Sequence, residues 1–487
     1  MKQAQMGIII LGLGPGSADL LTREAWRVLD AADEVYVRTR SHPAVSGLPE
    51  GLTIHSFDDL FHSDQTPEEV YTQIVEQISA LGRRPQGVLY AVPGDPMVAE
   101  ATVPEILRRA QKEGLPVRVI DGLSFLEPVF AALGIDPFPQ ISLVDALEEA
   151  TGHVPSFPPD KPALIAQIHS RQIVSDLKLI LMEVYPGDHP IRLVHAAGTD
   201  QEIVEELPLS EADHSERIGS LTALYVPPLG PGSSLESFQE IIAHLRAPNG
   251  CPWDREQTHL TLRPNLVEEA YEALSAIDEG SSQEMCEEFG DLLLQIVLHA
   301  QIAAEEGEFT MADVIQGIYA KIVRRHPHVF GDVDLADADS VLQNWERLKE
   351  VERANSGKTE AGLLTGVASA LPALVQAESY QQRVARVGFE WPDLQDVIAK
   401  VTRSFNQARM AEREDERAID VGDFLFAVVN LARWYSVDAE SALREANARY
   451  RRRVEYLEAA ARKQGVSISD LSKEEMEKLW KAAKEEE

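Results

Sequence analysis

The chain has 487 residues, of which 44% are hydrophobic and 26% charged, enough for about three packed domains. Its formal net charge of −35 disfavours nucleic acid as a partner, and a small anion would need bound metal or a few local Lys and Arg side chains. No apolar run reaches the ~18 residues that span a membrane, and two cysteines cannot build a disulfide framework. We therefore expect a cytoplasmic protein with no membrane partner.

The N-terminal part, residues 7–226, alternates short β-rich apolar runs with amphipathic helical stretches. Its first run, GIIILGL at 7–13, has no small-residue cleavage site and contains glycines, so it indicates a buried strand rather than a signal peptide. Strands that alternate with helices predict an α/β sheet with crossover helices. A second α/β stretch follows, with candidate strands such as ALIAQI, IRLVHAA and SLTALYVP.

Glycine- and proline-rich motifs punctuate this part. GLGPG at 12–16 does not meet the dinucleotide fingerprint GxGxxG, because Ser17 stands at the last glycine position. The ordered motifs that accompany it are VPGDP (92–96), DGLSFLEPVFAALGI (121–135), LMEVY (181–185) and AAGTDQEIVEELPL (196–209). Together they resemble the S-adenosyl-L-methionine (SAM)-dependent tetrapyrrole (corrin and porphyrin) methylases over 7–226.

This resemblance implies two α/β lobes with SAM in the cleft between them. By motif position, the SAM contacts would be Pro15, Gly94, Asp95, Val98, Ser124, Phe125, Met182 and Gly198. The chain departs from the family pattern at Asp121, where a proline is usual, and at Ala99 and Glu100, which replace a bulky residue and a glycine. A tetrapyrrole acceptor rests on analogy alone. We expect a methylase-like domain at 1–226, with methyl transfer as a second activity of the chain.

A linker and a change of period follow. Residues 227–234, PPLGPGSS, are dominated by Pro, Gly and Ser and predict a linker. From 235 onward the strand signal nearly vanishes, and apolar residues recur with the period of a helix. We therefore predict a multidomain protein in which an all-α half follows the α/β half.

The helical half repeats itself. Segments of the first copy return in the same order in the second: 287–301 as 419–433, 320–326 as 448–454, and 345–349 as 480–484. Recurrence in the same order predicts two helical repeats, at 235–355 and 370–487.

Two pairs of acids stand out in the first repeat. Glu269 and Glu272 lie three residues apart, as do Glu288 and Asp291, so each pair shares one helix face. In so acidic a chain such pairs are usually solvated. Glu269 and Asp291, however, fall in the apolar stripes expected to face the core, and buried carboxylates need a cation. An all-oxygen ligand set selects Mg²⁺ or Mn²⁺ rather than zinc, so we predict a metal site between two antiparallel helices.

Basic and aromatic residues suggest a ligand for that metal. Lys321 and Arg325 lie four apart on one helix face, which fits either a solvated helix end or a phosphate-binding pair. Because a carboxylate–metal cluster is predicted in the same repeat, we favour a polyphosphate ligand that the metal holds on one side and the basic side chains hold on the other. Trp253 and Trp345 are candidates for stacking on a base, although a tryptophan is more often a core residue.

The motifs CPWD, EExxE, ExxD, RRHPHVF and WExxK, together with the Lys–Arg helix, resemble those of the MazG-like nucleoside triphosphate (NTP) pyrophosphohydrolases over 240–487. The resemblance implies an all-α homodimer in which water attacks the α-phosphorus of an NTP, giving NMP and pyrophosphate. By motif position, Mg²⁺ (or Mn²⁺) would be held by Glu269, Glu272, Glu288 and Asp291, with Glu268 beside them as a water-orienting acid. Substrate contacts would come from Trp253, Lys321, Arg325, Trp345 and Lys349.

The second repeat departs from this pattern. Residues 403–407 read RSFNQ where EExxE is expected, and Asp420 and Asp423 stand where ExxD is expected. The remaining acids have no facing partners. We predict that this repeat binds no catalytic metal and has a structural role, packing against the first repeat or a second subunit.

The sequence thus predicts an NTP pyrophosphohydrolase, active in its first repeat, joined to a SAM-dependent methyltransferase-like domain. Two alternatives stay open. In one, methyl transfer is the main function and the helical half dimerises or senses nucleotides. In the other, the helical half is a non-enzymatic scaffold that binds metal and nucleotide.

Overall fold

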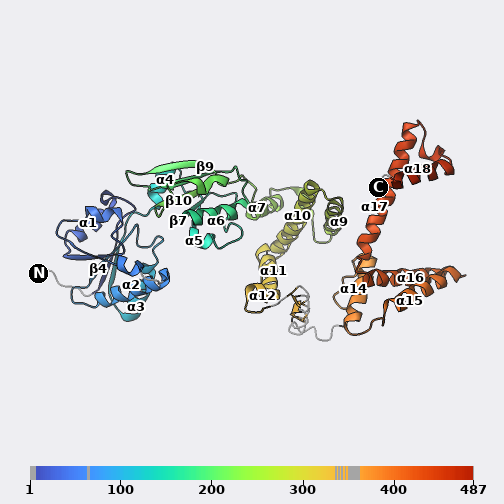
Figure 1. Cartoon of the computed structure of the whole chain (residues 1–487), viewed down its shortest axis with the longest axis horizontal. Helices are drawn as coiled ribbons and strands as arrows, with labels where there is room; N and C mark the ends of the chain where they lie inside the picture. Colours follow the sequence, from blue (N-terminus) through green and yellow to red (C-terminus); the bar gives the residue numbers. More distant parts are fainter. Residues whose placement is uncertain are drawn as a thin grey trace. The chain divides into compact units, whose positions relative to one another are not determined.

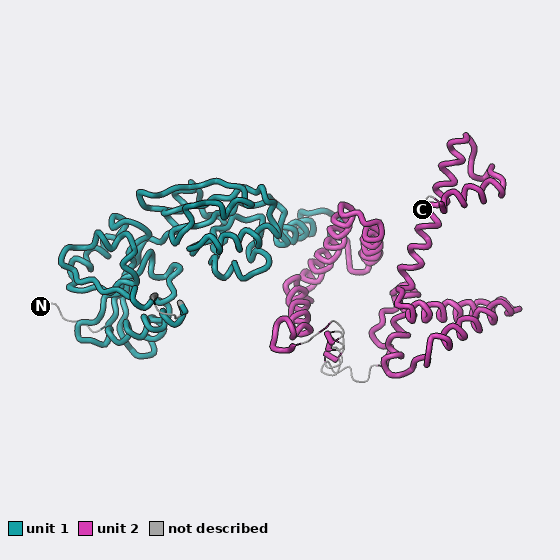
Figure 2. Tube along the Cα trace, viewed as in Figure 1, with its two compact units in different colours: residues 1–256 teal, residues 257–487 magenta. Residues whose placement is uncertain are grey.

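The computed structural model describes residues 7–62, 66–334 and 362–485. It also describes residues 337, 340–341, 344–345, 347–348 and 352. The chain divides into two compact units, Met1–Glu256 and Gln257–Glu487 (Figure 2). None of the described helices is both long and apolar enough to cross a membrane.

The first lobe of the N-terminal unit is built on a parallel sheet with the strand order β3-β2-β4-β1-β5 (Figure 1). Its strands are β1 (Ile8–Gly12), β2 (Glu34–Val37), β3 (Thr53–Ser56), β4 (Val88–Val92) and β5 (Val117–Ile120). Its helices are η1 (Ala18–Leu20), α1 (Arg23–Leu29), η2 (Pro43–Gly47), η3 (Asp58–His62), α2 (Pro67–Gly82) and α3 (Thr102–Glu113). Alternate residues of the central strands face two cores: Ile10 and Tyr90 pack with α2 and α3, whereas Leu11 and Ala91 pack with α1. Burial on both faces explains the continuous apolar runs of these strands.

The second lobe contains a mixed sheet with the strand order β6-β7-β10-β8-β9. Its strands are β6 (Ser142–Asp145), β7 (Ala163–Ile168), β8 (Pro190–His195), β9 (Ile203–Pro208) and β10 (Thr222–Val226). Its helices are α4 (Leu126–Leu133), α5 (Ala146–Glu149), α6 (Arg171–Met182) and η4 (Leu209–His214). Only β6 and β7 pair in parallel; the other pairs are antiparallel. The two lobes confirm the predicted α/β half, and β3 and β9 are edge strands that the sequence did not indicate.

The compact N-terminal unit extends past the predicted linker. Residues 227–234 contain no helix or strand, and α7 (Leu235–Arg246) and α8 (Pro252–Glu256) follow them. The N–H of Leu229 donates to the carbonyl of Pro159 at 2.8 Å, and the hydroxyl of Ser237 on α7 donates to Asp160. These bonds fasten α7 to the second lobe.

The second unit is helical, and its described residues contain no strand, which confirms the predicted all-α half. Its helices are α9 (Arg263–Glu279), α10 (Ser282–Glu306), α11 (Met311–Arg325), α12 (Pro327–Phe330), α14 (Ala373–Arg386), α15 (Leu394–Met410), α16 (Glu414–Trp434), α17 (Ala439–Lys463), η5 (Ile468–Asp470) and α18 (Lys473–Glu485). Gly280 ends α9 with a left-handed φ of 69°, and the hydroxyl of Ser281 accepts from the N–H of Glu284 to begin α10. This tight connection makes α9 and α10 a helical hairpin.

A similar arrangement recurs in the second repeat, where α15 and α16 pack together as a hairpin. Each hairpin is followed by a helix whose arginine lies over a tryptophan ring. Arg325 of α11 is 5.7 Å from the ring centroid of Trp345, and Arg453 of α17 is 5.5 Å from that of Trp480. The sequence repeat pairs these same positions, so the shared contact supports the predicted duplication.

Candidate metal centre and cofactor cleft

Three carboxylates of the first hairpin come together between α9 and α10. One side-chain oxygen from each of Glu269, Glu272 and Glu288 lies within 4.8 Å of the others. The two α9 residues are about one helical turn apart, and the antiparallel α10 brings Glu288 opposite them. At this spacing, small side-chain rotations allow one divalent cation to contact all three.

The fourth acid, Asp291, acts electrostatically on this cluster. Partial burial raises the pKa of Glu269, and the charges of Asp291 and Glu272 raise it further. Burial and then the charge of Glu272 raise the pKa of Glu288 in the same way. The Oε2 atom of Glu288 is buried and has no hydrogen-bond partner within the described part of the chain. A bound cation would relieve this repulsion, and oxygen donors favour Mg²⁺ or Mn²⁺.

The cluster is more open than the apolar stripes led us to expect. Glu269, Glu288 and Asp291 are partly buried, whereas Glu268 and Glu272 are exposed. A two-helix hairpin covers only one side of each helix, so acids that flank the contact stay accessible. The cluster can therefore be reached by a hydrated ion and by a substrate.

The predicted phosphate-binding residues lie on α11. Lys321 is exposed. Arg325 Nη2 lies 2.6 Å from Glu352 Oε2, and the hydrogen bonds from Arg325 and then Arg324 hold the pKa of Glu352 at about 2. The guanidinium of Arg325 also lies over Trp345. A phosphate that binds Arg325 must therefore compete with the carboxylate of Glu352.

Two further predicted substrate contacts lie outside the described part of the second unit. Trp253 lies on α8 in the N-terminal unit, and 60% of it is exposed. Lys349 lies outside the described residues. Their assignment to the nucleotide stays a prediction.

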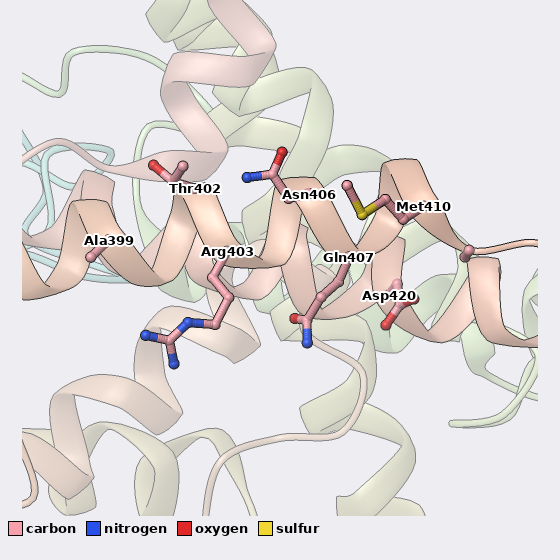
Figure 3. Close-up of a pocket in the computed structure, with 8 residues that line it drawn as sticks. Ala399, Thr402, Arg403, Asn406, Gln407, Met410 and Asp420 are labelled. Atoms are coloured by element: carbon pink, nitrogen blue, oxygen red, sulfur yellow. The ribbon is translucent and has the colours of Figure 1, made fainter.

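The second hairpin carries different chemistry at the matching place (Figure 3). Arg403, Asn406 and Gln407 of α15 and Asp420 of α16 line a cavity of about 720 Å³. Ser404, which the repeat aligns with Glu269, is fully buried. A cation at this place would be repelled by the guanidinium of Arg403, which is the physical reason to expect no catalytic metal here.

Contacts between the repeats involve α17 and the end of α9. Arg444 Nη2 lies 3.2 Å from Asp278 Oδ2, and its guanidinium is 5.6 Å from the ring centroid of Tyr271. Arg451 lies 3.6 Å from Glu279. Exposed ion pairs contribute only about 0–1 kcal/mol each, so these contacts orient the repeats more than they stabilise them.

The second candidate site is a cavity of about 190 Å³ lined by both lobes of the N-terminal unit. Four of the eight predicted SAM contacts line it: Pro15, Gly94, Val98 and Phe125. An adjoining cavity of about 570 Å³ shares the wall formed by residues 220–222. The two together reach the roughly 300–1,000 Å³ that is usual for small-molecule sites.

Glycines let three motif loops meet beside this cavity. A Cβ atom on Gly12 would lie 2.5 Å from the carbonyl oxygen of Gly94 and 2.7 Å from the Cα of Gly122. Position 12 therefore requires glycine. Gly94 lines the cavity with a φ of 67°, and no atom lies within 4 Å of the place its Cβ would take. That space is open to a ligand.

The other four predicted SAM contacts lie outside the cavity lining. Asp95 accepts a hydrogen bond from the N–H of Gly122 at 3.1 Å and so links two motif loops. Ser124 is buried before α4, and Gly198 approaches the first glycine turn closely. Met182 is 43% exposed at the end of α6.

The lining also contains polar residues that the motifs did not indicate. Burial, and then the charge of Arg38, lowers the pKa of His42 to about 4, so its imidazole is neutral near pH 7. Arg38 pairs at 2.8 Å with the buried Glu100, one of the departures from the methylase pattern. Ala99 and Gln167 adopt positive φ angles of 53° and 65°, and such strained backbone clusters at ligand sites. The departure at Ala99 and Glu100 was the one sequence signal of this arrangement.

Two family models match the chain. The MazG nucleotide pyrophosphohydrolase domain matches residues 257–330, which contain the carboxylate hairpin. The Tetrapyrrole (Corrin/Porphyrin) Methylases match residues 7–213, which contain the glycine loops.

Relatives extend these matches. The uncharacterized protein YabN of Bacillus subtilis (strain 168) is 42% identical over 489 residues, covering 99% of each chain. The nucleoside triphosphate pyrophosphohydrolase/pyrophosphatase MazG of Thermotoga maritima is 40% identical over 253 residues, covering 52% of this chain and 96% of that one. A nucleoside triphosphate pyrophosphohydrolase of Escherichia coli (strain K12) is 39% identical over 261 residues, covering 52% and 98%.

Proposed function

The chain belongs to the MazG nucleotide pyrophosphohydrolase family, and on this basis we propose that its helical half hydrolyses an NTP to NMP and pyrophosphate. The observation that carries the proposal is the approach of Glu269, Glu272 and Glu288 to within 4.8 Å, with Asp291 acting on them. The relatives named for this activity in T. maritima and E. coli support it.

The three converging carboxylates fit Mg²⁺ or Mn²⁺, since every donor is an oxygen and the buried Oε2 of Glu288 has no other partner among the described residues. When bound, the ion would activate water and neutralise charge on the leaving pyrophosphate. Glu268, exposed on α9 beside the cluster, would orient the water and accept its proton as the α-phosphorus is attacked.

Positive charge for the substrate comes from α11. Lys321 supplies an exposed ammonium, and Arg325 supplies a guanidinium that Glu352 keeps over Trp345. Carboxylate and phosphate use the same two-pronged arginine geometry, so a phosphate can replace Glu352 without moving the guanidinium far.

We also propose that a second copy of the chain covers the apolar surface of the helical unit. Large apolar side chains are exposed on α9, α10 and α11: Val267 (50%), Ile277 (48%), Phe289 (49%), Ile318 (47%) and Tyr319 (69%). Large exposed apolar side chains are common where subunits meet, and most homo-oligomers are symmetric dimers. Light scattering should give the mass of a dimer, and a monomer at micromolar concentration would contradict this part of the proposal.

Product analysis tests the main activity. The full chain, incubated with Mg²⁺ and each NTP or dNTP, should give the monophosphate and pyrophosphate. Release of NDP and phosphate would contradict the proposal. Glu269→Gln should abolish turnover while leaving the fold and the N-terminal cleft intact. Nucleotide binding without turnover by the parent chain would instead indicate a scaffold, and absence of both would leave the helical half a dimerising module.

A second activity is favoured by the cleft. We propose that the N-terminal unit binds SAM, since Gly94, which has open space beside it, lines one cavity together with the apolar Val98 and Phe125. When bound, SAM would supply an electrophilic methyl group on a sulfonium. The neutral His42 adds no positive charge that would repel it, and Glu100 neutralises Arg38.

Calorimetry with SAM tests this proposal on the full chain. Phe125→Ala should weaken binding about tenfold, because an aromatic contact contributes roughly 0.5–1.5 kcal/mol beyond its buried area. Phe138→Ala is the control, because this ring is 81% exposed. No binding by the parent chain would contradict the proposal.

A further inference from the structure

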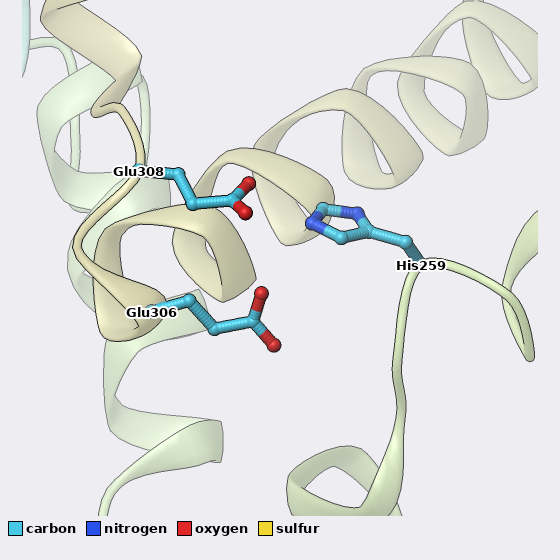
Figure 4. Close-up of side chains that lie close together, drawn as sticks. All are labelled: His259, Glu306 and Glu308. Carbon is cyan, nitrogen blue, oxygen red and sulfur yellow. The ribbon is translucent and has the colours of Figure 1, made fainter.

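We propose that the helical unit also binds Zn²⁺, at a site formed by His259, Glu306 and Glu308 (Figure 4). One ligand atom from each side chain lies within 4.8 Å of the other two. None of these residues belongs to the carboxylate cluster of the proposed active site.

Two stretches of backbone that are far apart in the sequence supply the ligands. His259 lies in the segment before α9, Glu306 is the last residue of α10, and Glu308 follows Gly307, whose φ of 73° ends that helix. Figure 4 shows the imidazole of His259 facing both carboxylates. Because Gly280 and Ser281 join α9 and α10 at the other end, a bound ion would close the open end of the same hairpin.

His299 orients the imidazole of His259. The Nδ1 atoms of the two rings are 2.7 Å apart, so one ring must donate and the other accept. If the Nδ1–H of His259 is the donor, the lone pair on its Nε2 stays available to bind a metal ion together with the two glutamates. Metal-bound histidines show this arrangement, in which the second nitrogen donates to a fixed acceptor. His299 is therefore a positioning residue.

The local charge balance favours a cation. Two carboxylates and an imidazole lone pair converge, and no Lys or Arg in the described ranges forms an ion pair with Glu306 or Glu308. The histidines border a cavity of about 380 Å³ whose other walls include Leu266, Ile296 and Phe309. An apolar wall lowers the local dielectric constant and strengthens attraction to a cation.

The donor set selects the ion. Imidazole nitrogen with carboxylate oxygen suits Zn²⁺, whereas Mg²⁺ prefers oxygen donors and keeps much of its water. The hairpin would then hold two kinds of ion, a hard one for chemistry at the carboxylate cluster and Zn²⁺ as a clamp at the end opposite the Gly280–Ser281 connection. The role we assign to Zn²⁺ is to fix the register of α9 against α10.

Zinc titration of the chelator-treated full chain tests this site. The parent for this experiment carries Glu269→Gln, Glu272→Gln and Glu288→Gln, so that the first cluster does not bind zinc. It should bind one Zn²⁺ per chain and gain thermal stability with Zn²⁺ but not with Mg²⁺. His259→Ala should lose that equivalent. Glu306→Gln with Glu308→Gln should lose it too, and these exposed residues place the fold at little risk.

Two further variants define the result. Glu305→Gln, next to the site on the exposed end of α10, is the matched control and should bind zinc like the parent. His299→Gln should weaken zinc binding by roughly 10–100-fold, as loss of an outer hydrogen-bond partner does elsewhere. Zinc binding that survives in both ligand variants, or its absence in the parent, overturns the proposal. Because turnover is not the readout, this result is independent of the pyrophosphohydrolase assay.

Discussion

The two hairpins of the helical unit have a common scaffold and different chemistry. In both, a pair of packed helices precedes a helix whose arginine lies over a tryptophan ring. The first hairpin presents Glu268, Glu269 and Glu272, and the second presents Arg403, Ser404 and Gln407 at the aligned positions. Apolar helix faces preserve the scaffold in both hairpins, whereas the α9 acids to which we assign the activity are present only in the first.

The largest expected difference between the hairpins is in turnover. Glu272→Gln with Glu288→Gln should lower kcat at least about 100-fold, because metal stabilisation of the transition state contributes several kcal/mol. The matched pair Asp420→Asn with Asp423→Asn should change kcat less than about twofold. Equal losses in steady-state pyrophosphate release would break the distinction between the hairpins.

Metal stoichiometry sharpens the same comparison. Electron paramagnetic resonance should detect Mn²⁺ bound to the full chain, with that signal lost in the first pair of variants and retained in the second. A cation near Arg403 is repelled, so the second hairpin should add no Mn²⁺. Retention of bound Mn²⁺ after removal of Glu272 and Glu288 would place the ion elsewhere.

The stacked arginines should differ in their effect on substrate. Arg325→Gln should raise KM for NTP about tenfold or more, since a charged hydrogen bond contributes roughly 1.5–3 kcal/mol. Arg453→Gln, the aligned change in the second repeat, should leave KM within about twofold. A comparable rise for both would mean that the arginine–tryptophan contact, rather than phosphate binding, accounts for the effect.

The smallest expected difference concerns pH. The pKa values of Glu269 and Glu288 lie above their ordinary value of 4.5, so the metal-free fold binds protons more tightly than the unfolded chain does. Their favourable contribution is complete below about pH 4.5 and is lost as pH rises through the raised pKa values. Mg²⁺ should therefore raise Tm by more at pH 7 than at pH 4.5. In Glu269→Gln with Glu288→Gln, scanning calorimetry should show little dependence of this shift on pH.

The clearest strand signals in the sequence belong to elements buried on both faces. β1 and β4 are continuous apolar runs because cores lie on both sides of them. β3 and β9 were not predicted, since edge strands expose many of their residues and lack a clear alternation. The attachment of α7 to the second lobe was not predicted either, because it depends on single hydrogen bonds that leave no periodic pattern in the sequence.

Contacts within one helix face were predictable, and contacts across the fold were not. The spacing predicted that Glu269 pairs with Glu272 and Glu288 with Asp291 on their own helices, although it overstated the burial of these acids. The structure brings Glu269, Glu272 and Glu288 within 4.8 Å of one another. Glu352 is 27 residues from Arg325, and His299 is 40 residues from His259. Nothing in the local pattern joins such distant residues, and only the fold brings them together.

Isotope placement tests the central claim most directly. Turnover of an NTP by the full chain in H₂¹⁸O, followed by mass spectrometry, reveals which phosphorus the water attacks. Attack at the α-phosphorus, the reaction assigned to the first hairpin, puts ¹⁸O into the monophosphate and leaves the pyrophosphate unlabelled. Label in pyrophosphate or in inorganic phosphate would contradict it.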